Sequence, residues 1–423
     1  MSPGPLPVLI VGAGVCGLTL AQHLRHAGVP FRIFDRDASI VARNGGWGLT
    51  FHWGLPILRD LLPPDIFARL EEAHINRDAA RRGDMGRYHF FNLRSGIDLY
   101  DLPAAARIRV SRGKLRSILA TNIPVEWSKK LVDVESTDDA VVVRFEDGTS
   151  CQGCLLVACD GSRSRVRQLL YPSTYRNRPV PVQLLGVTAR YSAEQIAAAR
   201  AIDPYFFQGT HPESNVYLWF SYLETPVHAE ASSDDYFCQV VMSWPESKAI
   251  QMPASNAERI ALMKSLSTDW AEPFRSLVQN LPDDAEVISI NIEDWLPEAN
   301  THGRGRVLLM GDAAHTMTMF RGEGANNAVA DIRDFLKRVG PHLPGYVQPS
   351  NNTASDNGRP PDPLRKCIDA YEDDIFARAK PCVLSSRQAC LDAHNFGRIN
   401  DGSALVARRL KEAAEAAKAA QKL

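Results

Sequence analysis

Apolar positions in the first 35 residues follow the spacing of a strand, then of a helix, then of a strand again. Residues 7–15 and 30–34 are apolar runs, and residues 17–27 carry leucine and alanine on one helical face. Because a helix between two such strands packs across a parallel sheet, this pattern predicts a βαβ unit. Much later in the chain, 306–310 again predicts a short buried strand and 327–339 a helix.

The middle of the chain has longer segments in which apolar and polar residues alternate. These segments cover 180–191, 215–224 and 236–244. Alternation of this kind is typical of an antiparallel sheet with one covered face, so a second domain is expected here. Residues 341–363 are rich in Pro, Asn, Ser and Gly and predict a mobile loop, while the Ala-, Lys- and Glu-rich tail after residue 403 predicts a solvated helix.

Composition narrows the range of partners. The chain has 423 residues, 45% of them hydrophobic, with 48 basic and 49 acidic residues and a net charge of -1. A balanced charge recruits neither nucleic acid nor an anionic membrane, so a small molecule is the expected partner. The start lacks a basic leader and no run of about 18 apolar residues occurs, which predicts a soluble cytoplasmic protein without a membrane span.

Eight cysteines are scattered along the chain and predict reduced thiols rather than a disulfide framework. Cys151 and Cys154 have a C-x-x-C spacing that a zinc or redox site would also use. A zinc site requires a second pair of ligands at suitable spacing, and none follows. Residues 154–159 instead match a buried strand, in which cysteine behaves as a small apolar residue. No metal site is therefore predicted.

The first candidate site is the fingerprint Gly12-x-Gly14-x-x-Gly17, placed between the first predicted strand and its helix. The three glycines permit a tight turn, a close approach of the backbone to a pyrophosphate, and close packing of the helix on the strand. The helix N-terminus offers N–H groups to the phosphates, and Asp35 at the end of the next strand can accept hydrogen bonds from a ribose. The context predicts a dinucleotide site without separating FAD from NAD.

Two further motifs follow in order. Residues 159–167 read CDGSRSRVR, and residues 307–315 and 321–327 read VLLMGDAAH and RGEGANN. Together with the glycine fingerprint they resemble the three fingerprints of the class A flavoprotein monooxygenases, an aromatic-hydroxylase family that includes many fungal secondary-metabolite hydroxylases. The resemblance spans residues 8–336, and three ordered motifs are far more specific than one.

The resemblance implies which residues hold FAD. The pyrophosphate would lie at the glycine fingerprint and the adenosine ribose at Asp35, with Arg36 beside it. Arg112 would contact FAD, because its fork-shaped cation suits a phosphate or ribityl oxygen, and Asp312 would bind the ribityl chain. The full implied set is Gly12, Gly14, Gly17, Asp35, Arg36, Gly48, Arg112, Asp160, Asp312, Gly322, Gly324 and Ala325.

Two segments of the family pattern surround the flavin ring. The backbone of Gly322, Gly324 and Ala325 would lie against the isoalloxazine, and residues 46–49 resemble the loop that passes beside it. The family commonly has proline at the position of Met319. Without that fixed backbone angle, a looser or reshaped loop is expected.

The Asp160 motif has a double role in the family, because it handles the pyrophosphates of both FAD and NAD(P)H. Of its arginines, Arg163, Arg165 and Arg167, at least one is expected to be helix-surface charge. His315 ends the third motif, and we interpret it as a structural hydrogen-bonding residue. To act as a general base, His315 would have to reach a proton of the substrate, and the motif does not show that it does.

The fold class follows from the pattern and the resemblance together. We predict an α/β protein with a Rossmann-like FAD-binding domain, an inserted antiparallel β-sheet substrate domain and C-terminal helices. The predicted parts are 1–175 and 286–340 for the FAD-binding domain, 176–285 for the substrate domain, 341–363 for a flexible loop and 364–423 for a C-terminal helical segment.

The family chemistry implies NAD(P)H and O2 as co-reactants. NAD(P)H would bind transiently and reduce the flavin, and O2 would add to give a flavin C4a-hydroperoxide that hydroxylates a small aromatic or polycyclic substrate. The protein would hold the substrate against that oxygen and exclude water.

Substrate contacts are expected from the antiparallel sheet and from the loop beside the flavin. The aromatic faces of His52, Trp53 and Trp219 could stack a ring, and Arg190 or Tyr217 could steer a phenolate as catalytic groups. Cross-strand packing is the competing interpretation of alternating aromatic residues on a strand.

Other flavin chemistries use related machinery. A Baeyer–Villiger or epoxidising oxygenase would use the same oxidised flavin. A non-oxygenating FAD dehydrogenase or reductase, or a flavin-bound interaction module, would bind the cofactor without inserting oxygen. A flavin-dependent halogenase would need a Trp-x-Trp-x-Ile-Pro type motif, which the sequence lacks.

Overall fold

The computed structural model describes residues 5–42, 46–103, 106–226, 235–246, 250–297, 305–345 and 364–420, with the backbone alone for 416–420. Of the loop predicted over 341–363, residues 346–363 lie outside the described residues. Within the described stretches, no helix is both long and apolar enough to cross a membrane.

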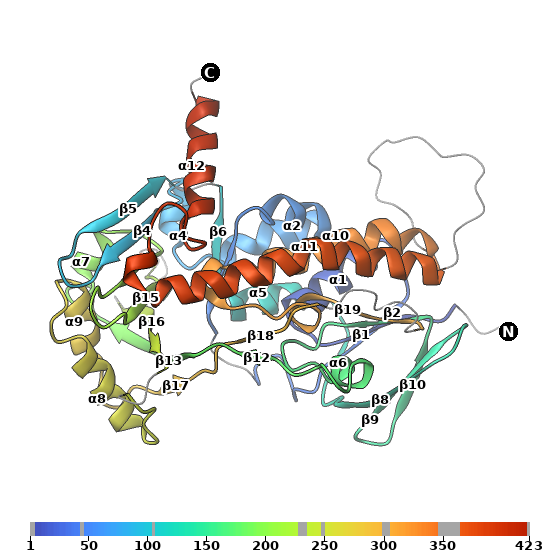
Figure 1. Ribbon diagram of the computed structural model, residues 1–423. Coiled ribbons are helices and arrows are strands. Elements are labelled where there is room, and N and C mark those ends of the chain that lie inside the picture. Colours follow the sequence, from blue (N-terminus) through green and yellow to red (C-terminus); the bar gives the residue numbers. More distant parts are fainter. Residues whose placement is uncertain are drawn as a thin grey trace.

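A five-stranded parallel sheet carries the glycine fingerprint (Figure 1). In spatial order its strands are Val307–Leu309 (β19), Leu155–Ala158 (β11), Val8–Val11 (β1), Phe31–Phe34 (β2) and Val125–Glu126 (β7). Every neighbouring pair is parallel. The three strands β1, β11 and β19 are buried at every residue, which explains their continuous apolar runs in the sequence.

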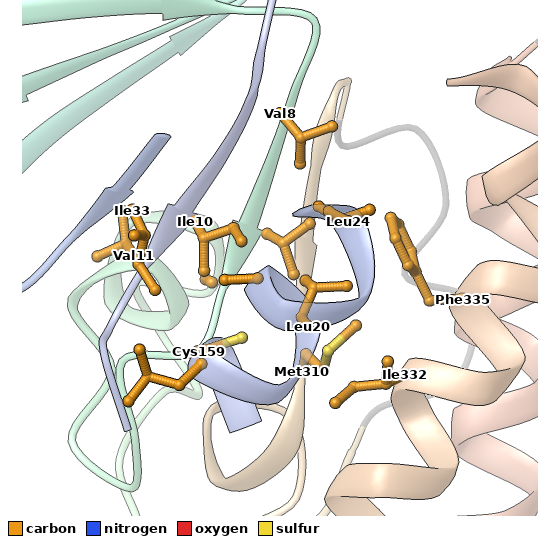
Figure 2. Packing of buried hydrophobic residues seen from close by; sticks show 14 of the residues in the cluster. Val8, Ile10, Val11, Leu20, Leu24, Ile33, Cys159, Met310, Ile332 and Phe335 are labelled. Carbon is orange, nitrogen blue, oxygen red and sulfur yellow. The ribbon is translucent and has the colours of Figure 1, made fainter. Parts of the chain in front are cut away.

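Helix α1, Val15–His26, connects β1 to β2, so the predicted βαβ unit is confirmed. Figure 2 shows Leu20 and Leu24 of α1 between strand β1 and Phe335 of helix α10, Gly324–Arg338. These three side chains are fully buried. Because burial of one such side chain stabilises a fold by about 1.5–3 kcal/mol, this layer holds the fingerprint turn between β1 and α1 in place.

A seven-stranded sheet lies at the other end of the molecule (Figure 1). In spatial order its strands are Val287–Ser289 (β17), Val182–Tyr191 (β13), Tyr236–Pro245 (β16), Tyr217–Glu224 (β15), Phe206–Thr210 (β14), Arg87–Asn92 (β4) and Asp98–Pro103 (β5). All neighbours are antiparallel except β14 and β4. The three long strands predicted from alternation, now β13, β15 and β16, are confirmed.

This sheet takes strands from both sides of the predicted domain boundaries. Strands β4 and β5 lie within 1–175 and β17 lies within 286–340, yet all three pair into the seven-stranded sheet. Strand β4 does so by pairing in parallel with β14. The boundaries at 175 and 285 therefore do not follow the sheet, and the division of the chain into domains stays a prediction.

A two-stranded ribbon lies between the sheets. It pairs Gly48–Phe51 (β3) with Ile108–Ser111 (β6) in antiparallel register, and both strands contact β15. Just before β3, the Trp47 ring lies on the seven-stranded sheet, where a Cβ at Gly186 would come within 2.8 Å of it. The segment 46–49, predicted as a loop beside the flavin, thus runs into a strand at Gly48.

The remaining elements are short and surround these sheets. Leu131–Ser136 (β8), Val141–Phe145 (β9) and Ser150–Gly153 (β10) form a three-stranded sheet, and Arg178–Pro179 (β12) pairs with Glu293–Asp294 (β18). The shorter helices are Leu55–Leu61 (α2), Pro64–Ala68 (α3), Arg77–Arg81 (α4), Arg112–Leu119 (α5), Arg165–Leu170 (α6), Ala197–Arg200 (α7), Asn256–Leu266 (α8) and Phe274–Gln279 (α9).

Two helices follow the gap after residue 345. Helix α11, Leu364–Ala393, runs along the molecule, and helix α12, Ala407–Ala420, projects from the body beside β5 (Figure 1). Helix α11 continues through Pro381, which has no backbone N–H to donate. Its contacts with α10 and with the segment Met319–Arg321 bring the C-terminal part of the chain to the candidate site.

Candidate functional site

The glycine fingerprint forms the turn between β1 and α1. Gly12 has a φ of +105°, and a Cβ there would lie 2.3 Å from the carbonyl oxygen of Cys159. A Cβ at Gly17 would lie 2.0 Å from the carbonyl oxygen of Gly12. Gly14 differs, because no atom lies within 4 Å of the position of its missing Cβ. The fold therefore requires two of the glycines, whereas the third leaves open space where a phosphate can approach the start of α1.

Asp35 follows β2 and faces the fingerprint turn. Its carboxylate accepts hydrogen bonds from the backbone N–H of Ala13 at 2.7 Å and of Asp37 at 2.9 Å. The buried Arg116 donates to the Ala13 carbonyl at 2.8 Å, and its guanidinium lies 3.7 Å from Asp35. Asp35 thus holds the turn itself, while the neighbouring Arg36 is exposed.

Asp312 lies in the short turn Gly311–Ala313 that follows β19. Solvent reaches its side chain, yet desolvation by the surrounding protein raises its pKa, an effect that positive charges including those of Arg112 and Arg167 oppose. The missing Cβ of Gly324 would lie 3.6 Å from Oδ1 of Asp312. An accessible carboxylate that protein atoms surround lies in a recess, and Arg112 and Gly324 lie near it.

His315 is fully buried in a structural network behind this turn. Its Nε2 lies 2.6 Å from Asp331, which also accepts a hydrogen bond from the backbone N–H of Gly311 at 2.7 Å and pairs with Arg378 at 2.5 Å. Burial opposes ionisation of Asp331, but the charges of His315 and Arg378 lower its pKa overall. The network ties the turn to α10 and α11, which agrees with the structural role expected for His315.

Asp160 supports the start of α6, whose N-cap residue is Ser164. Its Oδ2 accepts hydrogen bonds from the backbone N–H groups of Arg165, at 2.7 Å, and of the next residue, at 3.2 Å. Arg163 and Arg165 are exposed, which agrees with helix-surface charge. Arg167 is buried and donates to the Ala313 carbonyl at 3.2 Å. The motif therefore supports the turn that carries the third fingerprint, and any contact of Asp160 with a nucleotide stays a prediction.

Residues 319–325 form the loop expected to face the isoalloxazine, which we call the flavin-facing loop. It turns at Gly322, whose φ is +63° and whose missing Cβ would meet no atom within 4 Å. Ala325, in the first turn of α10, is half-buried. Asn326 fastens the loop to β3 by donating to the carbonyls of Gly322 at 3.0 Å and of Thr50 at 2.9 Å. Met319, where the family commonly has proline, is 44% exposed, so Asn326 rather than a rigid residue fixes this loop.

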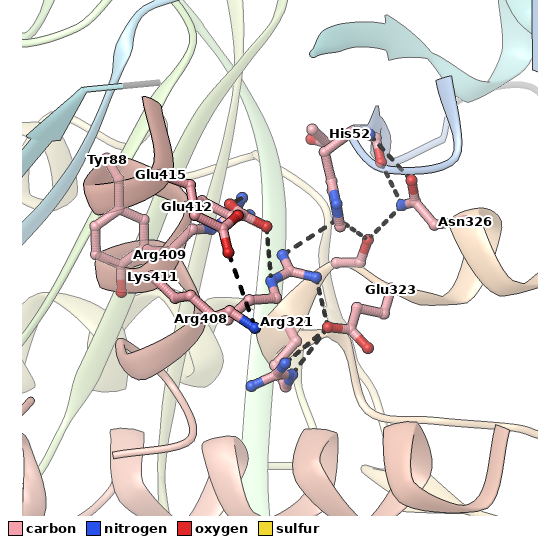
Figure 3. A network of polar contacts seen from close by, with 12 residues as sticks. His52, Tyr88, Arg321, Glu323, Asn326, Arg408, Arg409, Lys411, Glu412 and Glu415 are labelled. Carbon is pink, nitrogen blue, oxygen red and sulfur yellow. Dashed lines mark hydrogen bonds and ion pairs between the residues drawn. The ribbon is translucent and has the colours of Figure 1, made fainter. Parts of the chain in front are cut away.

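A charged network under the same loop reaches the C-terminal helix (Figure 3). Glu323 is buried, and its Oε1 accepts hydrogen bonds from Arg321 at 2.8 Å and from Arg408 of α12 at 2.5 Å. Arg408 also lies 3.4 Å from Nε2 of His52. The C-terminal helix thus clamps the flavin-facing loop, a contact between residues 85 positions apart that the sequence pattern did not reveal.

His52 is buried beside this network. Burial lowers its pKa to about 2, and the charges of Arg408, Arg409 and Arg107 add to the effect. Its Nε2 lies 3.3 Å from a carbonyl of the flavin-facing loop, and Trp53 lies edge-on to its ring at 6.2 Å. His52 is therefore neutral at ordinary pH. Its location agrees with the predicted substrate region, although its substrate role stays a prediction, as does that of Trp53.

The location of Arg190 corrects its assignment as a catalytic residue. Arg190 shares a face of β13 with Leu184 and Gly186, which are buried, but it lies near the exposed end of the strand. Its side chain is 63% exposed and forms an ion pair with Asp235. A solvated ion pair at a strand end is not placed to steer a substrate at the flavin-facing loop.

Tyr217 lies at the start of β15, and its hydroxyl group is already used. It donates to Gln208 at 2.7 Å, and burial raises its pKa well above the usual range. Its ring packs 5.2 Å from that of Phe320. Because the proton of this neutral phenol is donated to Gln208, it is not available to a substrate phenolate, and Tyr217 is placed as a packing residue.

Trp219 lies two residues farther along β15 and is half-buried. Its ring stacks on Phe206 at 4.7 Å, and the guanidinium of Arg109 lies 5.5 Å from its centroid. Arg109 is not among the site residues predicted from the sequence. The guanidinium of Arg109 donates hydrogen bonds to Thr50 and Ser221. These two residues lie on strands that are distant from Arg109 in the sequence, so no local motif marks it.

These features fit a bound FAD. The open backbone at Gly14 suits a pyrophosphate, the recessed carboxylate of Asp312 suits a ribityl chain, and the open turn at Gly322 suits the edge of a ring. The fit rests on shape and donor chemistry at three separate segments of the chain.

The chain matches known proteins along most of its length. A family model described as an FAD binding domain matches residues 5–52 and 115–350. A probable FAD-dependent monooxygenase of Arthroderma benhamiae is 40% identical over 427 residues, which cover 96% of each chain. The FAD-dependent monooxygenase dbaB of Emericella nidulans is 39% identical, with 79% of this chain and 86% of its own covered.

Solved structures share the mixed α/β fold. The 2,6-dihydroxypyridine-3-hydroxylase of Arthrobacter nicotinovorans has a TM-score of 0.71 at 18% identity, with 96% of this chain and 97% of that chain covered. HpxO of Klebsiella pneumoniae, complexed with FAD and uric acid, has a TM-score of 0.71 at 20% identity, with 97% and 93% covered. At these identities the likeness establishes the fold alone. The family model and the two fungal relatives establish more: this chain belongs to the FAD-binding family of FAD-dependent monooxygenases.

Proposed function

We propose that this monooxygenase uses NAD(P)H and O2 to hydroxylate a small aromatic or polycyclic molecule of secondary metabolism. The observation that supports this best is the aromatic surface near the flavin-facing loop. The half-buried rings of Trp47 and Trp219 provide this surface, and they pack on a hydrophobic cluster that contains the buried Tyr217 and Phe320. Phe320 lies two residues before Gly322. An apolar aromatic wall beside a flavin suits a flat ring as substrate.

Bound FAD supplies the redox chemistry that activates dioxygen. The residues of the chain bind the cofactor, position the substrate and exclude water from the reacting atoms. In this proposal the glycine fingerprint holds the pyrophosphate, Asp312 and Arg112 hold the ribityl chain, and the backbone of 322–325 lies along the ring. His52 stays uncharged beside that loop because burial and neighbouring cations disfavour its protonation.

NAD(P)H is proposed as a transient reductant. In the described stretches, the Gly12 fingerprint at the end of β1 is the site assigned to FAD, and no second glycine fingerprint of this type follows a strand of the parallel sheet. This arrangement suits a reductant that binds briefly at the surface and then dissociates. The role in secondary metabolism rests on the resemblance to fungal hydroxylases.

Two alternatives give different products from the same site. Baeyer–Villiger insertion or epoxidation would consume the same co-reactants but would yield an ester or an epoxide instead of a phenol. A non-oxygenating dehydrogenase would oxidise NAD(P)H without net insertion of oxygen. Oxygen uptake and a mass gain of one oxygen atom separate the oxygenases from the dehydrogenase, and the NMR structure of the product separates a phenol from an isomeric ester or epoxide.

The test uses FAD-loaded protein, NADH or NADPH, and a panel of phenols and anthraquinones, with NAD(P)H and O2 followed in parallel. The proposal predicts that one or more aromatic compounds accelerate both, in a one-to-one ratio, and that a hydroxylated product appears. Substrate-stimulated NAD(P)H oxidation without O2 uptake would contradict it. Asp312→Ala should lower FAD retention, whereas Cys151→Ser, on the outer strand β10, should not.

A further inference from the structure

Arg109 is a buried cation held at the junction of the ribbon and the seven-stranded sheet. It is 6% exposed, its Nε donates to Ser221 at 2.9 Å, and its Nη1 donates to Thr50 at 2.9 Å. A Cβ at Gly48 would lie 2.6 Å from Nη2 of Arg109, so the guanidinium lies against the backbone of the loop predicted beside the flavin. Glycine at position 48 is required for this placement.

Arg107 places a second buried guanidinium beside the first. It is 8% exposed and donates to the carbonyls of Met85 at 3.0 Å and Arg87 at 3.1 Å. Both guanidinium groups lie over the ring of Phe206, at 4.7 Å for Arg107 and 5.3 Å for Arg109. Two like charges on one aromatic ring repel each other, and a negatively charged group close to both would offset that repulsion.

No carboxylate neutralises this pair at contact distance. Within the described part of the chain, the hydrogen-bond acceptors of both guanidinium groups are neutral, namely backbone carbonyls for Arg107 and hydroxyl groups for Arg109. The carboxylate of Asp203 acts on both from farther away, and that of Glu412 acts on Arg107. Asp203 already accepts hydrogen bonds from the backbone N–H groups of Tyr205 at 2.7 Å and Phe206 at 3.0 Å. Burial lowers the pKa of Arg107 to about 10 and that of Arg109 to about 9.

Buried arginines bonded only to neutral groups are costly, because desolvation is not offset by an ion pair. The planar fork of a guanidinium suits an oxyanion, which would accept charge-assisted hydrogen bonds from it. The ring of Trp219 is half-buried, stacks on Phe206 and lies 5.5 Å from the Arg109 guanidinium, so accessible aromatic surface and a cation lie at the same place. An aromatic ring that carries an oxyanion would satisfy both groups.

We propose that Arg109, with Arg107 beside it, binds an oxyanion of the substrate, either a carboxylate or an ionised phenol, while Trp219 stacks on the substrate ring. This inference rests on the proposed function, because it names the substrate class for the same site. Both arginines lie in residues 53–114, the stretch between the two segments that the family model matches.

The test measures equilibrium binding to FAD-loaded protein without NAD(P)H, by calorimetry. The probes are 2-naphthoate, its neutral methyl ester and 4-nitrophenol, the last over a pH series around neutrality that ionises it while both arginines keep their charge. The wild-type protein should bind an oxyanion, 2-naphthoate or ionised 4-nitrophenol, at least about tenfold more tightly than the ester or the un-ionised phenol, since hydrogen bonds to charged groups are stronger than those to neutral groups. Which of the two anions is preferred distinguishes a carboxylate from a phenolate substrate.

Arg109→Gln should remove this preference and leave the ester affinity unchanged. Arg190→Gln is the matched control, because it makes the same change in an exposed arginine at a strand end. Should Arg109→Gln lose its flavin or its fold, Arg109→Lys keeps the charge but not the fork and should weaken anion binding by a smaller factor.

The inference is overturned if the wild-type protein binds neither anion more tightly than the ester, or if Arg109→Gln keeps the preference. Because no turnover is needed, these outcomes are independent of the proposed function. An enzyme that hydroxylates aromatic compounds but binds neither anion more tightly than the ester would keep the proposed function and lose this inference.

Discussion

Gly12 and Gly14 are two residues apart, yet alanine at each position should have a different effect. Gly12→Ala places a Cβ 2.3 Å from the Cys159 carbonyl at a φ of +105°, so the variant should lose about 3 kcal/mol or more of its free energy of unfolding. The measurement is urea unfolding of the FAD-free protein. Stability equal to that of the wild type would show that the turn is not built as described.

Gly14→Ala meets no protein atom within 4 Å, so the FAD-free protein should keep its stability to within about 0.5 kcal/mol. The FAD Kd should rise about tenfold or more, because one lost hydrogen bond to a charged phosphate costs about 1.5–3 kcal/mol. Fluorescence titration with FAD gives the Kd. An unchanged Kd would contradict the placement of the pyrophosphate at this turn.

His52 should make the protein sensitive to mild acid. Its folded pKa of about 2 lies below the value of about 6.5 for an unfolded histidine, so the unfolded chain binds the proton first. Stability is therefore fully present above pH 6.5 and is lost as the pH falls below it, by about 2 kcal/mol at pH 5.

His52→Gln should remove that contribution, so its free energy of unfolding should fall less than that of the wild type between pH 7 and pH 5. His26→Gln, at the exposed end of α1, is the control. Equal pH dependence in the wild type and His52→Gln would show that His52 is not held neutral.

At the scale of elements, helix α12 is attached to the flavin-facing loop mainly by charge. Arg408→Ala leaves Glu323 with Arg321 as its partner, so we expect a loss of about 1–3 kcal/mol of unfolding free energy and a weaker hold on FAD. Lys411→Ala on the same helix is the control, because that side chain is 78% exposed. Thermal unfolding and FAD titration of both variants measure the effect, and identical results for the two would rule out the clamp.

The sequence predicted elements wherever burial imposes a simple period. Strands β1 and β11 are buried on both faces and stand out as apolar runs, and β13, β15 and β16 stand out by alternation. Strand β4 was missed because its buried run, 88–91, includes His89, so it shows neither alternation nor a continuous apolar run. Its partner β14 is buried at all five positions, but three of them are Gln208, Gly209 and Thr210, so it is hidden in the same way.

At the scale of the whole molecule, the cofactor site was more predictable than the substrate site. Gly12, Gly14 and Asp312 belong to local motifs whose geometry follows from a strand and the turn after it. The contacts of Arg109 and Arg408 form only when strands and helices from distant parts of the chain come together. Arg190 was predicted as a site residue because alternation shows on which face of a strand a residue lies. Alternation does not show where along the strand that face becomes exposed to solvent.

We propose that this fold holds FAD so that an atom of dioxygen reaches an aromatic substrate. The most direct test is turnover under oxygen-18 gas with NAD(P)H and a compound that stimulates oxygen uptake, followed by mass spectrometry of the product. We predict that one oxygen-18 atom appears in the product and that none appears when only the water is labelled. Label from water, or an oxidised product without added oxygen, would contradict the claim.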